Sequence, residues 1–155
     1  MKIGLLVKRL NQIRHVEGVA KSATGRGHEV SLILDQPGAR GGPKGAEWPD
    51  SAKIPARVTA LAEIEVYGEA KSCDALVVPG PTAWGREDLN EFAKSWRCGL
   101  QTSVSDVLNL RAAGHYDVLY TWSAAWAEWR PTNPNDPGPE VVPVGLPLAE
   151  HLAWI

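Results

Sequence analysis

The sequence predicts a single-domain α/β fold built on a doubly wound, mostly parallel, Rossmann-like sheet. Four short apolar runs rich in β-branched residues recur along the 155-residue chain, at 2–7, 30–35, 75–78 and 117–121. Runs that are apolar on both faces are typical of strands covered by helices above and below. Segments with helical spacing separate them, and this alternation favours a parallel sheet of about five to seven strands.

The first unit is a strand, a helix and a second strand. A polar loop follows strand 2–7, and Val16, Val19, Ala20 and Ala23 then recur at helical spacing. The run 25–27, Gly-Arg-Gly, ends that helix, because glycine accepts the left-handed conformation that a helix end needs. The result is a βαβ unit, right-handed by the general rule.

Further elements follow the same reasoning. We expect short strands at 57–60, 100–104 and 141–145, and helices at 63–73, 86–96, 106–113 and 124–129. Cys98 then lies between a helix and a strand, where a structural role is expected.

Two segments are dominated by helix and strand breakers. Residues 36–56 hold four glycines and four prolines, and residues 131–139 hold four prolines. A loop as long as the first is either functional or mobile in a compact domain. We expect 36–50 to be mobile, because it carries little apolar surface to anchor it.

Bulk properties exclude several classes of partner. The formal net charge is −2 and no basic block is present, which argues against nucleic acid. No apolar run approaches the roughly 20 residues of a membrane span. With only Cys73 and Cys98 and no signal sequence before the first strand, a cytoplasmic location is expected.

Several common motifs are missing. The first strand is followed by Lys8–Gln12 in place of Gly-x-Gly-x-x-Gly, so a dinucleotide-binding phosphate loop is not expected. There is no Walker lysine motif and no Gly-x-Ser-x-Gly elbow. The two cysteines and the scattered histidines form no zinc pattern. We therefore expect no cofactor and no metal.

Two residues are candidates for acid–base chemistry. His15 lies where the first strand's loop becomes a helix, at the edge where open α/β sheets bind ligands, and could take a proton from an acceptor hydroxyl. Asp106 follows the expected strand 100–104 at the same edge and could orient the His15 ring. The alternatives remain an exposed histidine at a helix start and an aspartate favoured by a helix dipole.

Short pieces in order along the whole chain resemble the N-terminal, acceptor-side domain of GT-B glycosyltransferases. Gly25–Val30 looks like the Arg-Gly-His-Glu-Val signature that ends the first helix there, and Cys73–Pro79 is similar to the strand before the acceptor-side loops. Tyr116–Thr121 and Val142–Pro147 look like the domain's last strands. The chain departs from many relatives at Lys8–Gln12, where they carry a glycine-rich loop.

The resemblance implies transfer of a sugar from a nucleotide-sugar donor to a hydroxyl of a small molecule or glycan. The acceptor would bind this domain, and the donor would bind a C-terminal Rossmann-like domain that is missing here. The isolated chain is then expected to be inactive. With His15 as base and Asp106 as its partner, the implied acceptor groove would be lined by Asn11, Gln12, Gly80, Thr82, Trp84, Ser103, Trp122 and Ser123.

Two other interpretations remain open. Asp74–Gly80 and His28–Val30 also fit the DJ-1 and class I amidotransferase-like fold, which needs a cysteine in the turn after the next strand. Thr102–Asp106 holds none and Cys98 comes too early, so this would be a catalytically dead domain. The third interpretation is a Rossmann-like binding module without chemistry.

Overall fold

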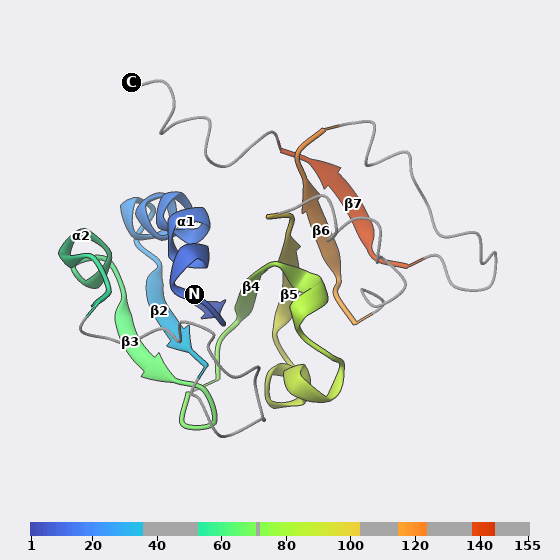
Figure 1. Ribbon diagram of the computed structural model, residues 1–155, viewed down its shortest axis with the longest axis horizontal. Coiled ribbons are helices and arrows are strands. Elements are labelled where there is room, and N and C mark those ends of the chain that lie inside the picture. Colours follow the sequence, from blue (N-terminus) through green and yellow to red (C-terminus); the bar gives the residue numbers. More distant parts are fainter. Residues whose placement is uncertain (36–52, 71, 103–114, 124–137, 145–155) are drawn as a thin grey trace.

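One parallel sheet of seven strands organises the protein (Figure 1). The computed structural model describes residues 1–35, 53–70, 72–102, 115–123 and 138–144. The strands are β1 (Lys2–Val7), β2 (Glu29–Leu34), β3 (Glu63–Val66), β4 (Ala75–Pro79), β5 (Trp96–Leu100), β6 (Val118–Thr121) and β7 (Glu140–Pro143).

The strand order is β3-β2-β1-β4-β5-β6-β7, and every neighbouring pair is parallel. The chain moves outward from β1 to β3 and then returns to the other side of β1 to begin β4. This is the order of a doubly wound Rossmann-like sheet, with its reversal between β1 and β4. The predicted fold class is confirmed.

Helical segments cover both faces of the sheet. The helices α1 (Ile13–Gly25) and α2 (Ala56–Thr59) pack on one face, together with inward side chains such as Leu5, Val7 and Leu32. The opposite face packs against the 3₁₀ helices η3 (Pro81–Ala83) and η4 (Glu87–Phe92), which contribute Leu89 and Phe92 to a second core. A third 3₁₀ helix, η1 (Leu10–Gln12), leads directly into α1.

Helix α1 ends where the sequence predicts, through a glycine in the left-handed conformation. Gly27 has φ +79°, its amide donates to the carbonyl of Thr24, and the amide of His28 donates to the carbonyl of Ala23. This pair of hydrogen bonds satisfies carbonyls of the last helical turn. Gly27 therefore turns the chain directly into β2.

Two expectations on the β3 side of the sheet were wrong. Residues 57–60 were expected as a strand but belong to the single helical turn α2, whose Arg57 pairs with Glu17 of α1 at 2.6 Å. Residues 63–73 were expected as a helix but begin with strand β3. Strand pairing prevails there because Glu65 points into the sheet's face, where Lys2 and Ser31 hold its carboxylate.

The fifth strand begins four residues earlier than predicted. Helix 86–96 is only the 3₁₀ helix η4, and the strand expected at 100–104 runs from Trp96 to Leu100. Cys98 therefore lies within β5 and not between a helix and a strand. Gly99 weakens the strand signal in the sequence, because glycine is a poor strand residue. The structure nevertheless needs glycine there, because an added Cβ would overlap Leu119 and lie 3.0 Å from Pro81.

The other expected elements divide into two groups. The last strand is confirmed, with bounds Glu140–Pro143, and the strand expected at 117–121 is β6. The expected helices at 106–113 and 124–129, the predicted mobility of 36–50 and most of the proline-rich segment 131–139 lie outside the described residues.

Candidate functional site

The reversal of strand order places a candidate site at the carboxyl ends of β1 and β4. Open α/β sheets bind ligands at this point, because the loops after the two strands diverge to opposite faces and leave a crevice between them. Here the loop after β1 leads through η1 into α1, whereas the loop after β4 leads into η3. The two loops thus meet at the predicted edge.

Gln12 ties these two loops together. Its Oε1 accepts hydrogen bonds from the backbone amides of Lys8 (2.8 Å) and Arg9 (3.0 Å), and its Nε2 donates to the carbonyl of Pro79 (2.9 Å). The side chain is buried. Gln12 was predicted to bind substrate, but in this structure its amide is fully engaged with the backbone of both loops.

Lys8 extends over the β4 side of the crevice. Its ammonium donates to the carbonyl of Ala83 at 3.0 Å and lies 4.8 Å from the ring centre of Trp84. Trp84, predicted to contact substrate, is 1% exposed and belongs to the core beneath η3. The contact holds the Lys8 charge at the crevice through a cation–π interaction.

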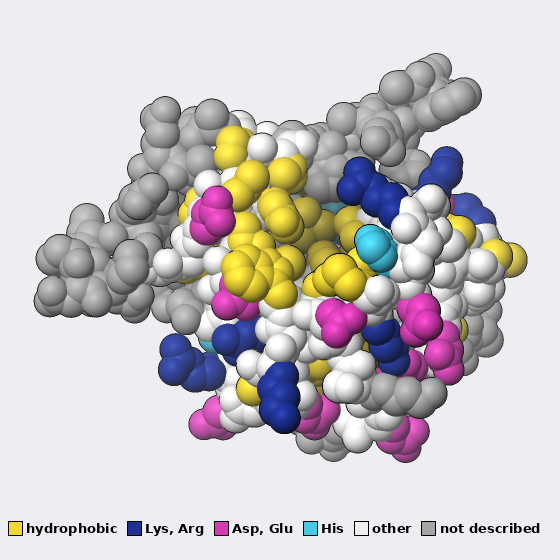
Figure 2. Space-filling model, turned by 180° about the vertical axis from the view of Figure 1, so that it is seen from behind, with side chains coloured by type: hydrophobic (Ala, Val, Ile, Leu, Met, Phe, Trp, Pro, Cys, Tyr) yellow, Lys and Arg dark blue, Asp and Glu magenta, His cyan; other side chains and the backbone are white. Residues whose placement is uncertain are grey.

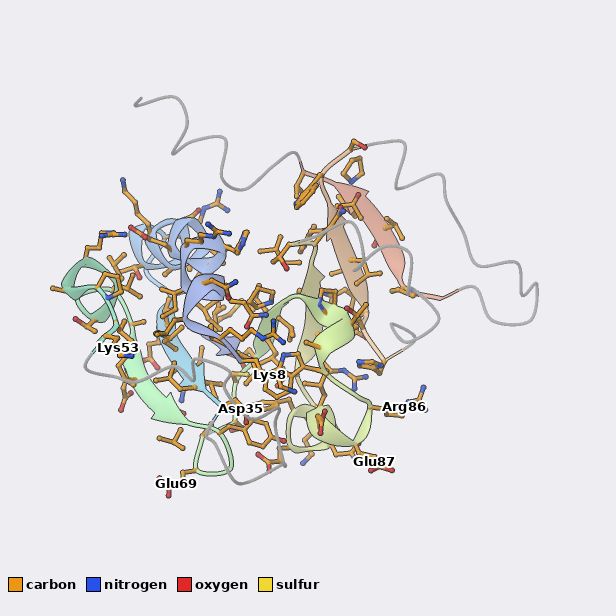
Figure 3. All side chains as sticks on the ribbon, in the orientation of Figure 1. Lys8, Asp35, Lys53, Glu69, Arg86 and Glu87 are labelled. Atoms are coloured by element: carbon orange, nitrogen blue, oxygen red, sulfur yellow. The ribbon has the colours of Figure 1, made fainter. Side chains whose placement is uncertain are left out.

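A carboxylate follows the neighbouring strand. Val7 pairs with Leu34, so Lys8 and Asp35 are the first residues beyond β1 and β2, and Figure 3 shows both near the centre of this edge. Asp35 is fully buried, and its amide donates to the carbonyl of Val7. The edge therefore combines a half-buried ammonium with a buried carboxylate.

A second bridge rigidifies the β5 and β6 ends. The Oε1 of Gln101 accepts from the amide of Trp122 at 2.9 Å, and the indole Nε1 of Trp122 donates to the Gln101 carbonyl at 2.8 Å. Gln101 is buried, whereas Trp122 is half-buried and the following Ser123 is exposed. The predicted contact residues Trp122 and Ser123 thus remain accessible beside a fixed strand end.

The remaining predicted site residues divide by accessibility. Asn11 is exposed and Thr82 half-buried, so both present side chains at the edge. Gly80 is buried, with φ +67°, and turns the chain from β4 into η3. Asp106 and Ser103 lie outside the described residues.

His15 lies on the sheet-facing side of α1 and is 5% exposed. Arg14 Nε donates to His15 Nε2 at 3.4 Å. The ring lines a hollow between α1 and the sheet that also contains Leu100 and Tyr120, but none of the loop from Gly80 to Trp84. The predicted cleft shared by His15 and that loop is not found among the described residues, and the catalytic role of His15 stays a prediction.

Burial shifts the pKa values of Cys98 and His115 in opposite directions. Burial, followed by the charge of Asp117, raises the pKa of the Cys98 thiol to about 11, which disfavours a reactive thiolate. Burial lowers the pKa of His115, and the nearby charges of Arg97 and Arg86 lower it further. The Cys98 side chain is buried within β5, and its structural role stays a prediction.

The described residues contain no cluster of three or more His, Cys, Asp or Glu side chains able to hold a metal ion. Within the same residues, no helix combines the length and the apolar character needed to cross a bilayer. Comparisons with protein-family models, curated proteins and solved structures found no match.

Sequence reasoning did not single out three polar residues that lie at this edge of the sheet. Lys8 and Asp35 directly follow apolar runs, and that position alone could have marked them, because the first residues beyond parallel strands line the ligand edge. Gln101 was missed because the end of its strand was placed four residues too late.

Proposed function

We propose that this chain is the acceptor-binding half of a glycosyltransferase, which moves a sugar from a nucleotide-sugar donor to an acceptor hydroxyl. The seven-stranded parallel sheet and its reversal between β1 and β4 support a ligand site at the carboxyl edge. Asn11, Thr82, Trp122 and Ser123 are the accessible side chains there and would contact the acceptor.

The engagement of Gln12 is the observation that carries the proposal. In a dinucleotide-binding domain, the backbone amides after the first strand face the pyrophosphate. Here the amides of Lys8 and Arg9 donate to the Gln12 side chain, which also bridges to Pro79. This favours nucleotide binding elsewhere, as expected if a second domain holds the donor.

In this proposal the general base is His15. His15 is buried beside the hollow, so it could deprotonate only a hydroxyl that enters the space next to α1. Joined to a donor-binding domain, a His15→Ala variant should lose about 10²–10⁴-fold in turnover with little change in acceptor affinity. Turnover within a few-fold of the parent would remove His15 from the mechanism.

Ligand-observed NMR on the isolated chain tests whether it binds the acceptor but not the nucleotide-sugar donor. Nucleotide sugars should neither bind nor be hydrolysed, whereas hydroxyl-bearing sugars, glycosides or phenols should include a binder that Thr82→Val weakens. Thr59→Val is the matched control, because Thr59 is exposed on α2, away from this edge. Binding of a nucleotide sugar that depends on Thr82 would refute the proposal.

A non-catalytic binding module is the second candidate. The bridges made by Gln12 and Gln101 favour it, since they hold the loops at this edge by hydrogen bonds within the protein itself. The amidotransferase-like alternative is a special case: Cys98 lies inside β5, and Gln101 and Thr102 follow that strand. Ligand binding without any transfer, even with a donor-binding domain supplied, would favour this second candidate.

A further inference from the structure

A large hollow opens between α1 and the β4–β6 part of the sheet. Its volume is about 550 Å³, within the range of roughly 300–1,000 Å³ that small-molecule sites occupy. Figure 2 shows a hollow with hydrophobic walls near the centre of one face, with a histidine and basic side chains along one side. We call it the α1 hollow; its lining is Ile3, His15, Gly18, Val19, Ser22, Ala23, Arg26, His28, Ala75, Val77, Cys98, Leu100, Tyr120 and Val144.

The floor of the α1 hollow is apolar. Val77, Leu100 and Tyr120 extend from three adjacent strands onto this face, and Val144, just beyond β7, is 52% exposed at the rim. Among the described residues, α1 packs beside these strands and leaves part of their surface open. An alkyl chain could therefore lie along the floor and remove this surface from water.

The lining has one permanently charged residue among the described residues, and it is the arginine Arg26. Arg26 and His28 lie at the amino edge of the sheet, since β2 begins at Glu29, and His15 lines the other end of the helix. The described part of the lining contains no aspartate or glutamate. From His15 to Arg26 the helix rises about 16 Å, at 1.5 Å per residue. The hollow thus joins a long apolar floor to a cationic edge.

We propose that the α1 hollow binds a single-chain amphipathic anion. The alkyl chain lies across β4–β6, and a carboxylate or phosphate head group is held at Arg26 and His28. A guanidinium binds either head group through paired N–H donors. This site shares His15 with the proposed transferase, but its head-group end at Arg26 and His28 lies away from Gly80 and Thr82, so the binding test below does not require sugar transfer.

Gly18 offers a way to block the hollow without disturbing the fold. It lies on α1 in the lining, and a Cβ added there meets no atom within 4 Å. Gly18→Leu should extend into the empty space, whereas Gly18→Ala adds only one methyl group and serves as the control. Both changes favour the helix, because glycine is a poor helix residue.

The two cysteines report occupancy of the two faces separately. Cys98 lines the hollow, whereas Cys73 belongs to the core on the opposite face. In the full chain, decanoate, decyl phosphate and decanol are added at concentrations where they remain monomeric. Affinity is measured by calorimetry, and the slow labelling of each buried cysteine by a large excess of maleimide is followed by mass spectrometry.

Decanoate, decyl phosphate or both should bind and slow the labelling of Cys98 but not that of Cys73. Gly18→Leu should weaken this binding about tenfold or more, since it displaces two or three buried methylene groups, and Gly18→Ala should not. Arg26→Gln should weaken the anions about threefold and leave decanol unchanged. Lys21→Gln, on the same helix but outside the lining, is its control. The stronger of the two anions identifies the head group.

Three results would overturn the proposal. If decanol binds as tightly as both anions and Arg26→Gln changes none of the three affinities, the hollow is an apolar surface that does not recognise an anion. A dimer in analytical ultracentrifugation that Gly18→Leu dissociates would assign the hollow to a second copy of the chain. If the added ligands protect Cys98 from labelling only after residues 145–155 have been removed, the hollow would be assigned to that segment.

Discussion

Replacing Gln12 with alanine should destabilise the protein far more than its position in a connecting loop suggests. The change removes three hydrogen bonds: those from the amides of Lys8 and Arg9 to Oε1, and that from Nε2 to the carbonyl of Pro79. Each is worth about 1 kcal/mol net, and more where the abandoned group stays buried. We therefore expect the free energy of unfolding to fall by about 3 kcal/mol.

Urea unfolding followed by circular dichroism measures this loss. At about 2–4 °C per kcal/mol for a domain of this size, the melting temperature should fall by about 6–12 °C. Gln12→Glu keeps the two bonds to Oε1 but sets a carboxylate oxygen against the Pro79 carbonyl, so it should lose about half as much. The neighbouring Asn11 is exposed, and Asn11→Ala should change stability by less than about 0.5 kcal/mol.

Hydrogen exchange locates the effect. In Gln12→Ala the amides of Lys8 and Arg9 should exchange faster than in the parent protein. The exchange rates of the β2 amides should rise only by the amount that the loss of global stability accounts for. The reasoning would be refuted if Gln12→Ala were no more destabilising than Asn11→Ala, or if the exchange of both amides were unchanged.

Three further predictions concern the core. Gly99→Ala should lower the free energy of unfolding by about 1–3 kcal/mol in urea, because its Cβ overlaps Leu119; a loss below about 0.5 kcal/mol would mean that Leu119 moves aside freely. Lys2→Met should cost about 3 kcal/mol by removing the ammonium that pairs with the buried Glu65 carboxylate, and adding Glu65→Leu should recover most of it; a double variant as unstable as the single one would contradict this. The pKa of Cys98 is about 11 in the folded protein and roughly 8.5 for a free thiol. The neutral thiol therefore contributes to the free energy of unfolding in full below pH 8.5, roughly the unfolded pKa, and this contribution is lost as the pH rises through the folded pKa. Stability measured across this range should therefore fall less in Cys98→Ala than in the parent, and identical profiles would exclude the effect.

The central strands were predictable because each carries its own signal. β1, β2 and β4 are continuous apolar runs, buried on both faces, and their sequences alone require helices above and below. From such strands the parallel sheet and its ligand edge follow by general rules of topology.

The mistaken elements depend on contacts that local sequence does not contain. β3 has charged residues at alternate positions, and Glu65 can be buried only because Lys2 and Ser31 reach it from two other strands. In β5, Gly99 looks like a strand breaker but is required where β5 packs against Leu119. Tertiary packing overrides local preference in both places.

The candidate site was predictable in its loops and less so in its side chains. Position after a strand identified the edge, but a polar residue there can either face a ligand or satisfy the backbone, and sequence does not distinguish the two. Gln12 and Trp84 were expected at the surface and are buried, whereas Asn11 and Thr82 are accessible. The α1 hollow had no local signal, since its described lining comes from five helices and strands and two connecting segments.

The Gln12 bridge also has a consequence during synthesis. It joins residues 67 positions apart, so the first loop of the protein cannot be fixed until Pro79 has been made. At about 5–20 residues per second, the ribosome delivers that partner roughly 3 to 13 s after Gln12. Until then β1, an interior strand of the finished sheet, has an open edge and a loop without its anchor. The amino-terminal βαβ unit should therefore leave the ribosome as a partly formed half-sheet, and its β1 edge is the surface that most needs protection from other nascent chains.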